Sequence, residues 1–210
     1  MSKQLKYVNI KHLLILMGLT ISISIYAQTA KAYYASGNTK YQTGDYKGCI
    51  QDNTKAIELD STNATAYFSR AEAKNQLLDY TGALLDYDKA IALNPNYAKA
   101  YLRRGNTKTI AGNFKEAIVD YTKAIGLNPK DASAYFDRAD AEAKVEDYKM
   151  AILDYTKVIE LTPKDASAYI NRGFCKEKTN DTKGTCADWL KAKELGSMDA
   201  NNLLNQFCKG

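Results

Sequence analysis

The sequence contains a single histidine, His12, which falls in a segment that we expect to be removed from the mature protein. The mature chain therefore has no imidazole for general acid–base catalysis, for activating a Ser or Cys nucleophile, or for a zinc site that needs one. The sequence also has no Cys-x-x-Cys pair, phosphate-binding loop, Gly-rich dinucleotide turn or zinc-protease motif. We expect no enzymatic activity, no cofactor, no metal and no small-molecule substrate.

Acidic residues are absent from the first 27 positions, which contain Lys3, Lys6 and Lys11. The formal net charge is +5 for the whole chain and falls to +2 when this segment is left out. A chain so nearly balanced has no electrostatic footprint for binding nucleic acid. Charged residues make up 25% of the chain and hydrophobic residues 45%, which argues against both global disorder and a multi-span membrane protein.

The basic start is followed by an uncharged, mostly apolar run at residues 13–25. A helix of this length spans about 20 Å, whereas a bilayer core needs roughly 20 residues. The pattern is typical of a signal peptide, which we place at residues 1–27 with cleavage after Ala27. Cleavage after Ala32 and an uncleaved anchor, the one expected membrane contact, are the alternatives. We expect a periplasmic, secreted or envelope-associated protein in an oxidising compartment.

The rest of the sequence consists of one repeated unit. Tyrosine, a small residue and leucine each recur every 34 residues, and proline keeps the same step in three copies. The tyrosines of the first row are Tyr33, Tyr67, Tyr101, Tyr135 and Tyr169. This agreement predicts five repeats within residues 28–199, at 30–63, 64–97, 98–131, 132–165 and 166–199.

Each repeat has the pattern of two helices joined by a turn. In the third repeat, Gly112 lies between two stretches of helical periodicity, and Pro129 ends the pair because proline cannot continue a helix. We expect Gly105 to face Ala117, so that the two helix backbones approach closely. An isolated pair cannot bury its apolar face, and neighbouring pairs must therefore stack.

This pattern resembles the tetratricopeptide repeat (TPR), whose signature combines aromatic and small residues with a turn and a late proline. The third repeat carries it as Tyr101, Gly105, Gly112, Phe114, Ala117, Tyr121, Ala124 and Pro129. The first repeat departs from it at Cys49, Asn53 and Ser61, and the fifth at Asn180 and Thr185. The resemblance covers residues 30–199 and implies an all-α, right-handed α-solenoid of five helix hairpins, with a concave face that binds polypeptide.

Residues 198–210 predict a capping helix after the last repeat. Ala200, Leu203, Leu204 and Phe207 form an apolar stripe at helical spacing. Such a helix would cover the exposed end of the fifth repeat and keep the protein soluble.

Four cysteines follow the signal segment. The stretch from Cys186 to Cys208 resembles the C-terminal end of exported bacterial TPR proteins, and we expect a Cys186–Cys208 disulfide that fixes the cap. A bridge from Cys175 to either of them is the alternative. Cys49 occupies a small-residue core position and is interpreted as an unreactive thiol.

Two charged rows also follow the repeat. Their members are Arg70, Arg104, Arg138 and Arg172 on the first helices, and Asp52, Asp86, Asp120, Asp154 and Asp188 on the second helices. We interpret them as an Arg–Asp ladder, because paired charges can be partly buried whereas lone ones cannot. Pairing within each repeat would leave Asp52 alone, and pairing with the preceding repeat would leave Asp188 alone. The periodic tyrosines are interpreted as core.

The resemblance also implies which first-helix positions face the concave groove. These combine an apolar row with amide and charged side chains, which suits an extended or helical peptide. The groove residues predicted in this way are Tyr34, Asn38, Phe68, Glu72, Lys99, Leu102, Arg103, Asn106, Phe136, Asp140, Ile170 and Phe174. The alternative is that the apolar row only packs between neighbouring first helices.

The sequence therefore predicts a non-catalytic protein–protein interaction module, acting as an adaptor or assembly factor in the cell envelope. One alternative is weak capture of a partner's C-terminus. Asn38, Lys99 and Arg103 match the carboxylate clamp of chaperone-binding TPR domains, whereas Tyr34 and Ser69 do not. The other is self-association through the irregular first repeat.

Overall fold

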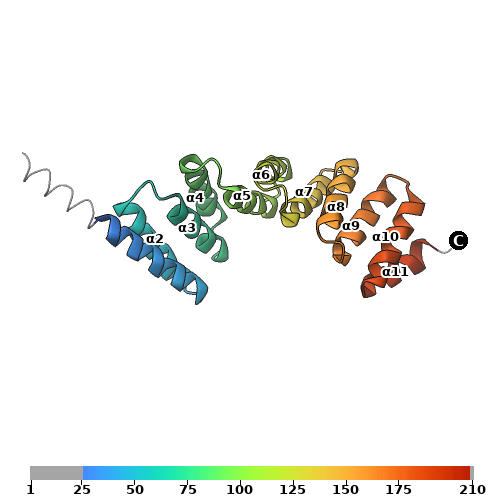
Figure 1. Ribbon diagram of the computed structural model, residues 1–210, viewed down its shortest axis with the longest axis horizontal. Coiled ribbons are helices and arrows are strands. Elements are labelled where there is room, and N and C mark those ends of the chain that lie inside the picture. The colour runs from blue at the N-terminus through green and yellow to red at the C-terminus, as the bar shows by residue number, and fades with distance from the viewer. Residues whose placement is uncertain (1–25, 209–210) are drawn as a thin grey trace, which may run out of the picture. The chain divides into compact units, whose positions relative to one another are not determined.

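The computed structural model describes residues 26–208, which form helices joined by short connections and contain no strand (Figure 1). The chain divides into two compact units between Pro95 and Asn96. In the first unit, a helix at residues 26–42 precedes three further helices. These are α2 (Tyr46–Leu59), α3 (Ala64–Gln76) and α4 (Tyr80–Leu93).

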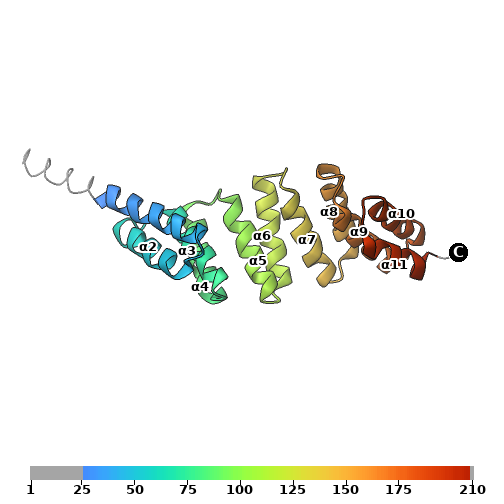
Figure 2. The ribbon, with the colours of Figure 1, turned by 90° about the horizontal axis from the view of Figure 1, so that it is seen from below.

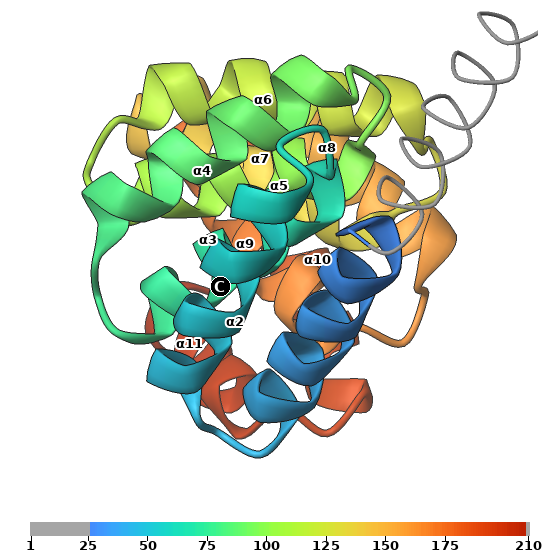
Figure 3. The same cartoon turned by 90° about the vertical axis from the view of Figure 1, so that its left-hand side faces the viewer.

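The second unit contains the remaining helices. They are α5 (Ala98–Ile110), α6 (Phe114–Leu127), α7 (Ala132–Lys144), α8 (Tyr148–Leu161), α9 (Ala166–Lys178), α10 (Thr182–Glu194) and α11 (Met198–Phe207). In both units consecutive helices pack against each other, as Figure 2 shows for α5, α6 and α7 and Figure 3 for the helix of residues 26–42 beside α2. The expected fold class, all-α with stacked helix hairpins, is confirmed.

The segment expected to be a signal peptide, residues 1–27, lies outside the described residues except for its last two positions. Among residues 26–208, none of the helices combines the length and the apolar character that crossing a membrane requires.

Each hairpin turn contains one residue with a left-handed backbone. Glycine occupies this place at Gly44 (φ 82°) and Gly112 (φ 79°), where the missing Cβ makes a positive φ easy. Leu78, Glu146 and Asn180 adopt the same conformation at the equivalent places, with φ between 62° and 64°. The turn geometry is therefore set by the hairpin and imposed on Leu78 and Glu146, whose side chains disfavour it, whereas asparagine tolerates it.

Aromatic side chains of the second helices form the core of the hairpins. Tyr87, Tyr121, Tyr155 and Trp189 are among the largest fully buried side chains. The first-row tyrosines are different, and for them the core interpretation is only partly correct: Tyr33 is 37% exposed and Tyr67 is buried at 9%. Each of the last four instead lies under the guanidinium of the arginine three residues later, as with Arg138, 5.8 Å from the centre of the Tyr135 ring.

The closest neighbour of Gly105 is an aromatic ring, which our expectation that Gly105 faces Ala117 did not include. A Cβ placed on Gly105 would lie 2.7 Å from Cε1 of Tyr121. The Tyr121 ring therefore takes up the space that glycine leaves.

We expect Gly105→Ala to lower the free energy of unfolding by roughly 1–3 kcal/mol, because the buried Tyr121 ring must move to admit a methyl group. Gly126→Ala, on the second helix of the same hairpin, is the control. Nothing lies within 4 Å of a Cβ at Gly126, so helix propensity should raise stability by about 0.5–1 kcal/mol. Urea unfolding of both variants checks the pair, and equal effects would contradict the close-contact explanation.

The Arg–Asp ladder pairs within each repeat. Arg172, for example, donates from Nε and Nη2 to the two carboxylate oxygens of Asp188, at 2.9 and 2.6 Å. A lysine four residues after the arginine adds a second cation in most repeats, as Lys176 does at 2.9 Å from Asp188. Asp52 is not left alone, because Lys40 lies 2.7 Å and the Ser36 hydroxyl 2.6 Å from its carboxylate.

Arg70, Arg138 and Arg172 also connect their hairpins to the preceding ones. The Nη1 group of Arg138 donates to the Thr122 hydroxyl at 2.9 Å, and that of Arg172 donates to Thr156 at 3.0 Å. Each of these three guanidinium groups thus bonds the second helix of its own repeat and the second helix of the preceding repeat. The ladder holds neighbouring repeats together as well as the two helices of one hairpin.

The last helix, α11, packs on α10, as expected for a cap. Ser197 caps it by accepting a hydrogen bond from the Ala200 backbone N–H, and the Phe207 ring lies 5.5 Å from the Trp189 ring. The predicted Cys186–Cys208 disulfide is present, with Cα atoms 5.9 Å apart. Cys49 and Cys175 are buried free thiols, so the alternative bridge from Cys175 does not form.

Removing this disulfide should destabilise the C-terminal end selectively. The bridge closes a loop of 22 residues, for which loss of the cross-link costs about 3 kcal/mol. We expect Cys208→Ser to lower the temperature at which α10 and α11 unfold, as measured by hydrogen exchange of their amides. Dithiothreitol should reproduce the effect in the wild type and leave the variant unchanged.

Candidate functional site

In the first unit, the predicted groove residues are largely engaged in packing. Phe68 is only 6% exposed, and its ring lies 5.8 Å from the Tyr87 ring. Glu72 accepts a hydrogen bond from the Tyr87 hydroxyl. Tyr34 and Asn38 are half-buried, and Asn38 accepts a hydrogen bond of 3.0 Å from the hydroxyl of Ser69.

In the second unit, the polar groove positions bind the buried tyrosines in the same way. The Asn106 amide nitrogen lies 2.9 Å from the Tyr121 hydroxyl and 3.1 Å from Asp137. Asp140 accepts a hydrogen bond from the Tyr155 hydroxyl. Because Tyr121 and Tyr155 are fully buried, these first-helix side chains satisfy hydroxyl groups that have no access to water.

The predicted apolar row is interrupted. Leu102 is 9% exposed and belongs to a core cluster with Ala117 and Tyr121. Phe136 and Ile170 are half-buried, whereas Phe174 is 41% exposed although its ring also packs 5.4 Å from the Trp189 ring. Apolar surface for a ligand is therefore concentrated near Phe174 rather than spread along every repeat.

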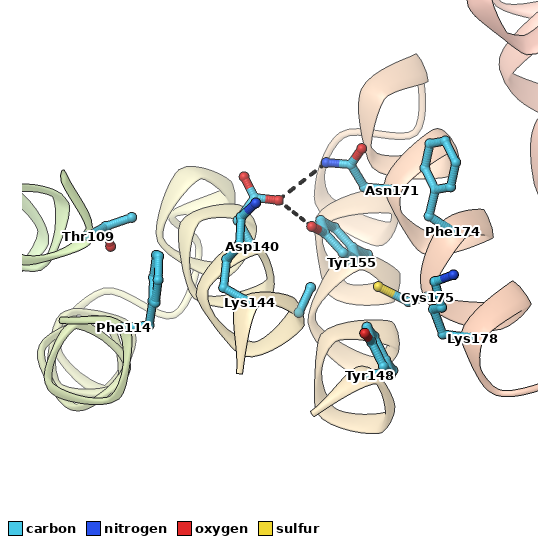
Figure 4. Close-up of a pocket in the computed structure, with 11 residues that line it drawn as sticks. Thr109, Phe114, Asp140, Lys144, Tyr148, Tyr155, Asn171, Phe174, Cys175 and Lys178 are labelled. Atoms are coloured by element: carbon cyan, nitrogen blue, oxygen red, sulfur yellow. Dashed lines mark hydrogen bonds between the residues drawn. The ribbon is translucent and has the colours of Figure 1, made fainter. Parts of the chain in front are cut away.

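An open groove of about 430 Å³ lies in the second unit, mainly over α7, α8 and α9 (Figure 4). Of the predicted residues, it brings together Asp140 and Phe174. Its other lining residues, which were not predicted as groove residues, are Thr109, Phe114, Ala143, Lys144, Tyr148, Tyr155, Asn171, Cys175 and Lys178. A repeat-based signal existed for two of them, because Lys144 and Lys178 are 34 residues apart at equivalent ends of α7 and α9.

The groove has a polar wall and a basic rim. Asp140 accepts hydrogen bonds from the Tyr155 hydroxyl and, at 3.2 Å, from the Asn171 amide, as Figure 4 shows. Burial raises the pKa of the Asp140 carboxyl, while these two hydrogen bonds and the charge of Lys144 act in the opposite direction. Lys144 and Lys178 are exposed. Apolar, amide and ammonium groups thus share one open surface, which suits a polypeptide segment.

Phe136 lines a second hollow of about 380 Å³, on α7 and α8, together with Asp137 and Val158. Burial, with repulsion from Asp140, raises the pKa of Asp137 to about 6, and Asn106 and Arg103 oppose the shift. Three of the predicted groove residues of the second unit therefore line these two hollows: Asp140 and Phe174 the first, and Phe136 the second.

The three residues that match the carboxylate clamp, Asn38, Lys99 and Arg103, do not all belong to the same unit. Asn38 belongs to the first unit, while Lys99 and Arg103 lie on α5 in the second, where Lys99 is exposed and Arg103 is half-buried. Within the part of the chain that the structure describes, no three His, Cys, Asp or Glu side chains gather in a way that would hold a metal ion.

Comparison with known proteins adds two solved structures of the same fold. The chain superposes on the crystal structure of MamA protein with a TM-score of 0.76 and 24% identity, over 80% of this chain and 92% of that one. YrrB, described as a TPR protein with an unusual peptide-binding site, gives a TM-score of 0.77 and 22% identity, over 89% and 97% of the two chains. These two likenesses show the fold.

A third structure is more similar in sequence over a shorter length. The first TPR of Spaghetti (RPAP3), bound to the HSP90 peptide SRMEEVD, gives a TM-score of 0.56 and 29% identity. The match covers 57% of this chain and 94% of that one. A search of curated proteins gave no match.

Family models match the sequence itself over more than half of its length. Models described as tetratricopeptide repeat match residues 30–63, 98–131 and 132–165, and one described as TPR repeat matches residues 75–109. Sequence and fold agree, and the chain belongs to the tetratricopeptide repeat family.

Proposed function

We propose that this protein is a non-catalytic interaction module that binds a peptide or protein partner in the groove over α7, α8 and α9. The family and the fold support a protein–protein interaction module. The observation that carries the choice of surface is the open groove of about 430 Å³, which combines exposed Phe174 with the two lysines of its rim. An exposed aromatic side chain beside polar groups is typical of binding surfaces.

We also propose that the protein acts as an adaptor or assembly factor in the cell envelope. The support is the pattern of residues 1–27, typical of a signal peptide, and the Cys186–Cys208 disulfide, because such bonds persist in oxidising compartments. YrrB has a peptide-binding site by its description, and the RPAP3 domain binds the peptide SRMEEVD. We therefore expect an extended or helical polypeptide as the ligand of this chain too.

Selection from a random peptide library displayed on phage, with residues 28–210 as bait, tests the proposal. A selected peptide is then titrated calorimetrically into the bait and its variants. We expect Phe174→Ala and Lys144→Ala each to weaken binding by roughly 5- to 30-fold, as for contacts worth about 1–2 kcal/mol.

Leu153→Ala is the matched control, because Leu153 is an exposed apolar residue of α8 that does not line the groove. It should bind the selected peptide like the wild type. Circular dichroism of the Phe174 variant verifies that loss of its contact with Trp189 has not unfolded the repeat. Equal affinities for the groove variants and the wild type would show that the groove is not the binding surface.

A further inference from the structure

One repeat breaks the charge pattern of the others. Lysine follows the ladder position by four residues in four repeats, at Lys40, Lys74, Lys108 and Lys176. The ammonium group of each lies 2.7–2.9 Å from the ladder aspartate of its repeat. The fourth repeat has Glu142 at this place, so a carboxyl group faces Asp154 where the other repeats present a cation.

The surroundings of Glu142 do not compensate for a negative charge. Both oxygens of Asp154 already accept hydrogen bonds from Arg138, at 2.6 and 2.8 Å, while Oε1 of Glu142 is 3.7 Å from Arg138 Nε. Glu142 is only 5% exposed, and its Oε2 has no hydrogen-bond partner among residues 26–208. An ionised Glu142 would therefore leave two buried carboxylates sharing one guanidinium.

Among residues 26–208, Arg138 is the cation that acts on the charge of Glu142. From α8, both Asp154 and Asp147 act on it with negative charge. From α9, the buried Cys175 thiol is close enough for Glu142 to raise the pKa of that thiol. From α6, the neutral Thr122 hydroxyl accepts a hydrogen bond from Nη1 of Arg138. Binding a proton removes the uncompensated charge with the least rearrangement.

We propose that Glu142 is held as a neutral carboxylic acid in the folded protein near neutral pH and acts as a proton switch in the fourth repeat. Release of its proton to solvent places a second negative charge beside Asp154 and weakens the packing of α7 on α8. These two helices, together with α9, line most of the groove. Loss of the proton from Glu142 therefore changes the wall of the groove whether or not a ligand is bound.

The direction of the pH dependence follows from the same environment. Burial, followed by the charge of Asp154, raises the pKa of Glu142 from 4.5 to about 7. As pH rises, the unfolded chain loses this proton first, so stability falls between about pH 4.5 and 7 and remains lower above that range. The pKa values of Asp137 and Asp140 are also raised, so both carboxyl groups add to the loss of stability as pH rises. Asp137 does so at lower pH than Glu142.

Thermal unfolding between pH 5 and pH 8 tests the switch. The wild type should lose about 5 °C or more in Tm over this range, and Glu142→Gln should lose distinctly less. Glu142→Lys should restore the pairing of the other repeats and melt above the wild type at pH 8. Glu160→Gln, which removes an exposed glutamate of α8, is the control and should behave like the wild type.

A direct measurement complements the melting curves. The side-chain carboxyl carbon of Glu142, assigned by its absence in Glu142→Gln, is followed by NMR as pH is raised. A midpoint near 7 supports the proposal even if Glu142→Lys does not fold. A midpoint below about 5, or equal losses of Tm in the wild type and Glu142→Gln, would overturn it.

Discussion

Trp189→Ala is expected to lower the free energy of unfolding of the C-terminal repeats by about 3–5 kcal/mol, the range for emptying a buried aromatic site. Trp189 is fully buried and is packed from two sides, by the Phe174 ring at 5.4 Å and by the Phe207 ring of the cap at 5.5 Å. Its indole N–H also donates to the Ile170 carbonyl at 3.2 Å. The substitution therefore creates a cavity, removes the indole hydrogen bond to the Ile170 carbonyl and loosens the cap.

Urea unfolding followed by circular dichroism measures the loss, and Trp189→Phe separates its causes. Phenylalanine keeps most of the ring contacts and loses only the hydrogen bond and part of the volume, so a cost of roughly 1–2 kcal/mol is expected. If alanine and phenylalanine had equal effects, packing by Phe174 and Phe207 would not explain the importance of Trp189.

Asp188→Ala is expected to cost about 3–5 kcal/mol, because it leaves two mostly buried cations without their anion. Asp188 accepts hydrogen bonds from Nε and Nη2 of Arg172 and also lies 2.9 Å from the Lys176 ammonium group. The Arg172 and Lys176 side chains are only 14% and 19% exposed, so water replaces the lost carboxylate poorly.

The equivalent change in the fourth repeat, Asp154→Ala, is the matched comparison and should cost distinctly less, roughly 1–2 kcal/mol. Oε1 of Glu142 already lies 3.7 Å from Nε of Arg138, so Glu142 can replace the lost carboxylate. The repulsion between Glu142 and Asp154 also disappears. Urea unfolding of both variants at pH 8, where Glu142 is mostly ionised, gives the clearest contrast. A larger loss for Asp154→Ala would contradict the ladder geometry described for these two repeats.

The repeat pattern made the hairpins predictable from sequence. Tyr121 and Ala117 are buried as their spacing on one helix face indicates, and the turn at Gly112 has the positive φ that favours glycine. Periodicity succeeds here because each helix must bury one face, and the buried face determines the recurring residue types.

The Arg–Asp pairing was not predictable in the same way. Periodicity places Arg138 equally well for Asp154 of its own repeat and for Asp120 of the preceding one, since both recur with the same step. Only side-chain reach in three dimensions distinguishes them, and the hydrogen bonds of 2.6 and 2.8 Å go to Asp154.

The groove was the least predictable part. A polar residue such as Asp140 has the same sequence signature whether it faces a ligand or accepts a hydrogen bond from a buried tyrosine hydroxyl. The tyrosine that it serves, Tyr155, lies 15 residues away. Conversely, Lys144 and Lys178 at the groove rim resemble ordinary solvated lysines at helix ends, and only the groove beside them distinguishes their position.

The connection from Arg138 to Thr122 and from Arg172 to Thr156 has a consequence for the growth of such chains. Each of these two arginines needs only one threonine from the preceding hairpin, and α6 and α8 present that hydroxyl at equivalent positions. A copy of the α7–α8 hairpin inserted between α8 and α9 would find both of its bonding partners already in place. Gene duplication can therefore lengthen this protein without inventing a new contact, and the number of hairpins is free to vary while the joint between them stays the same.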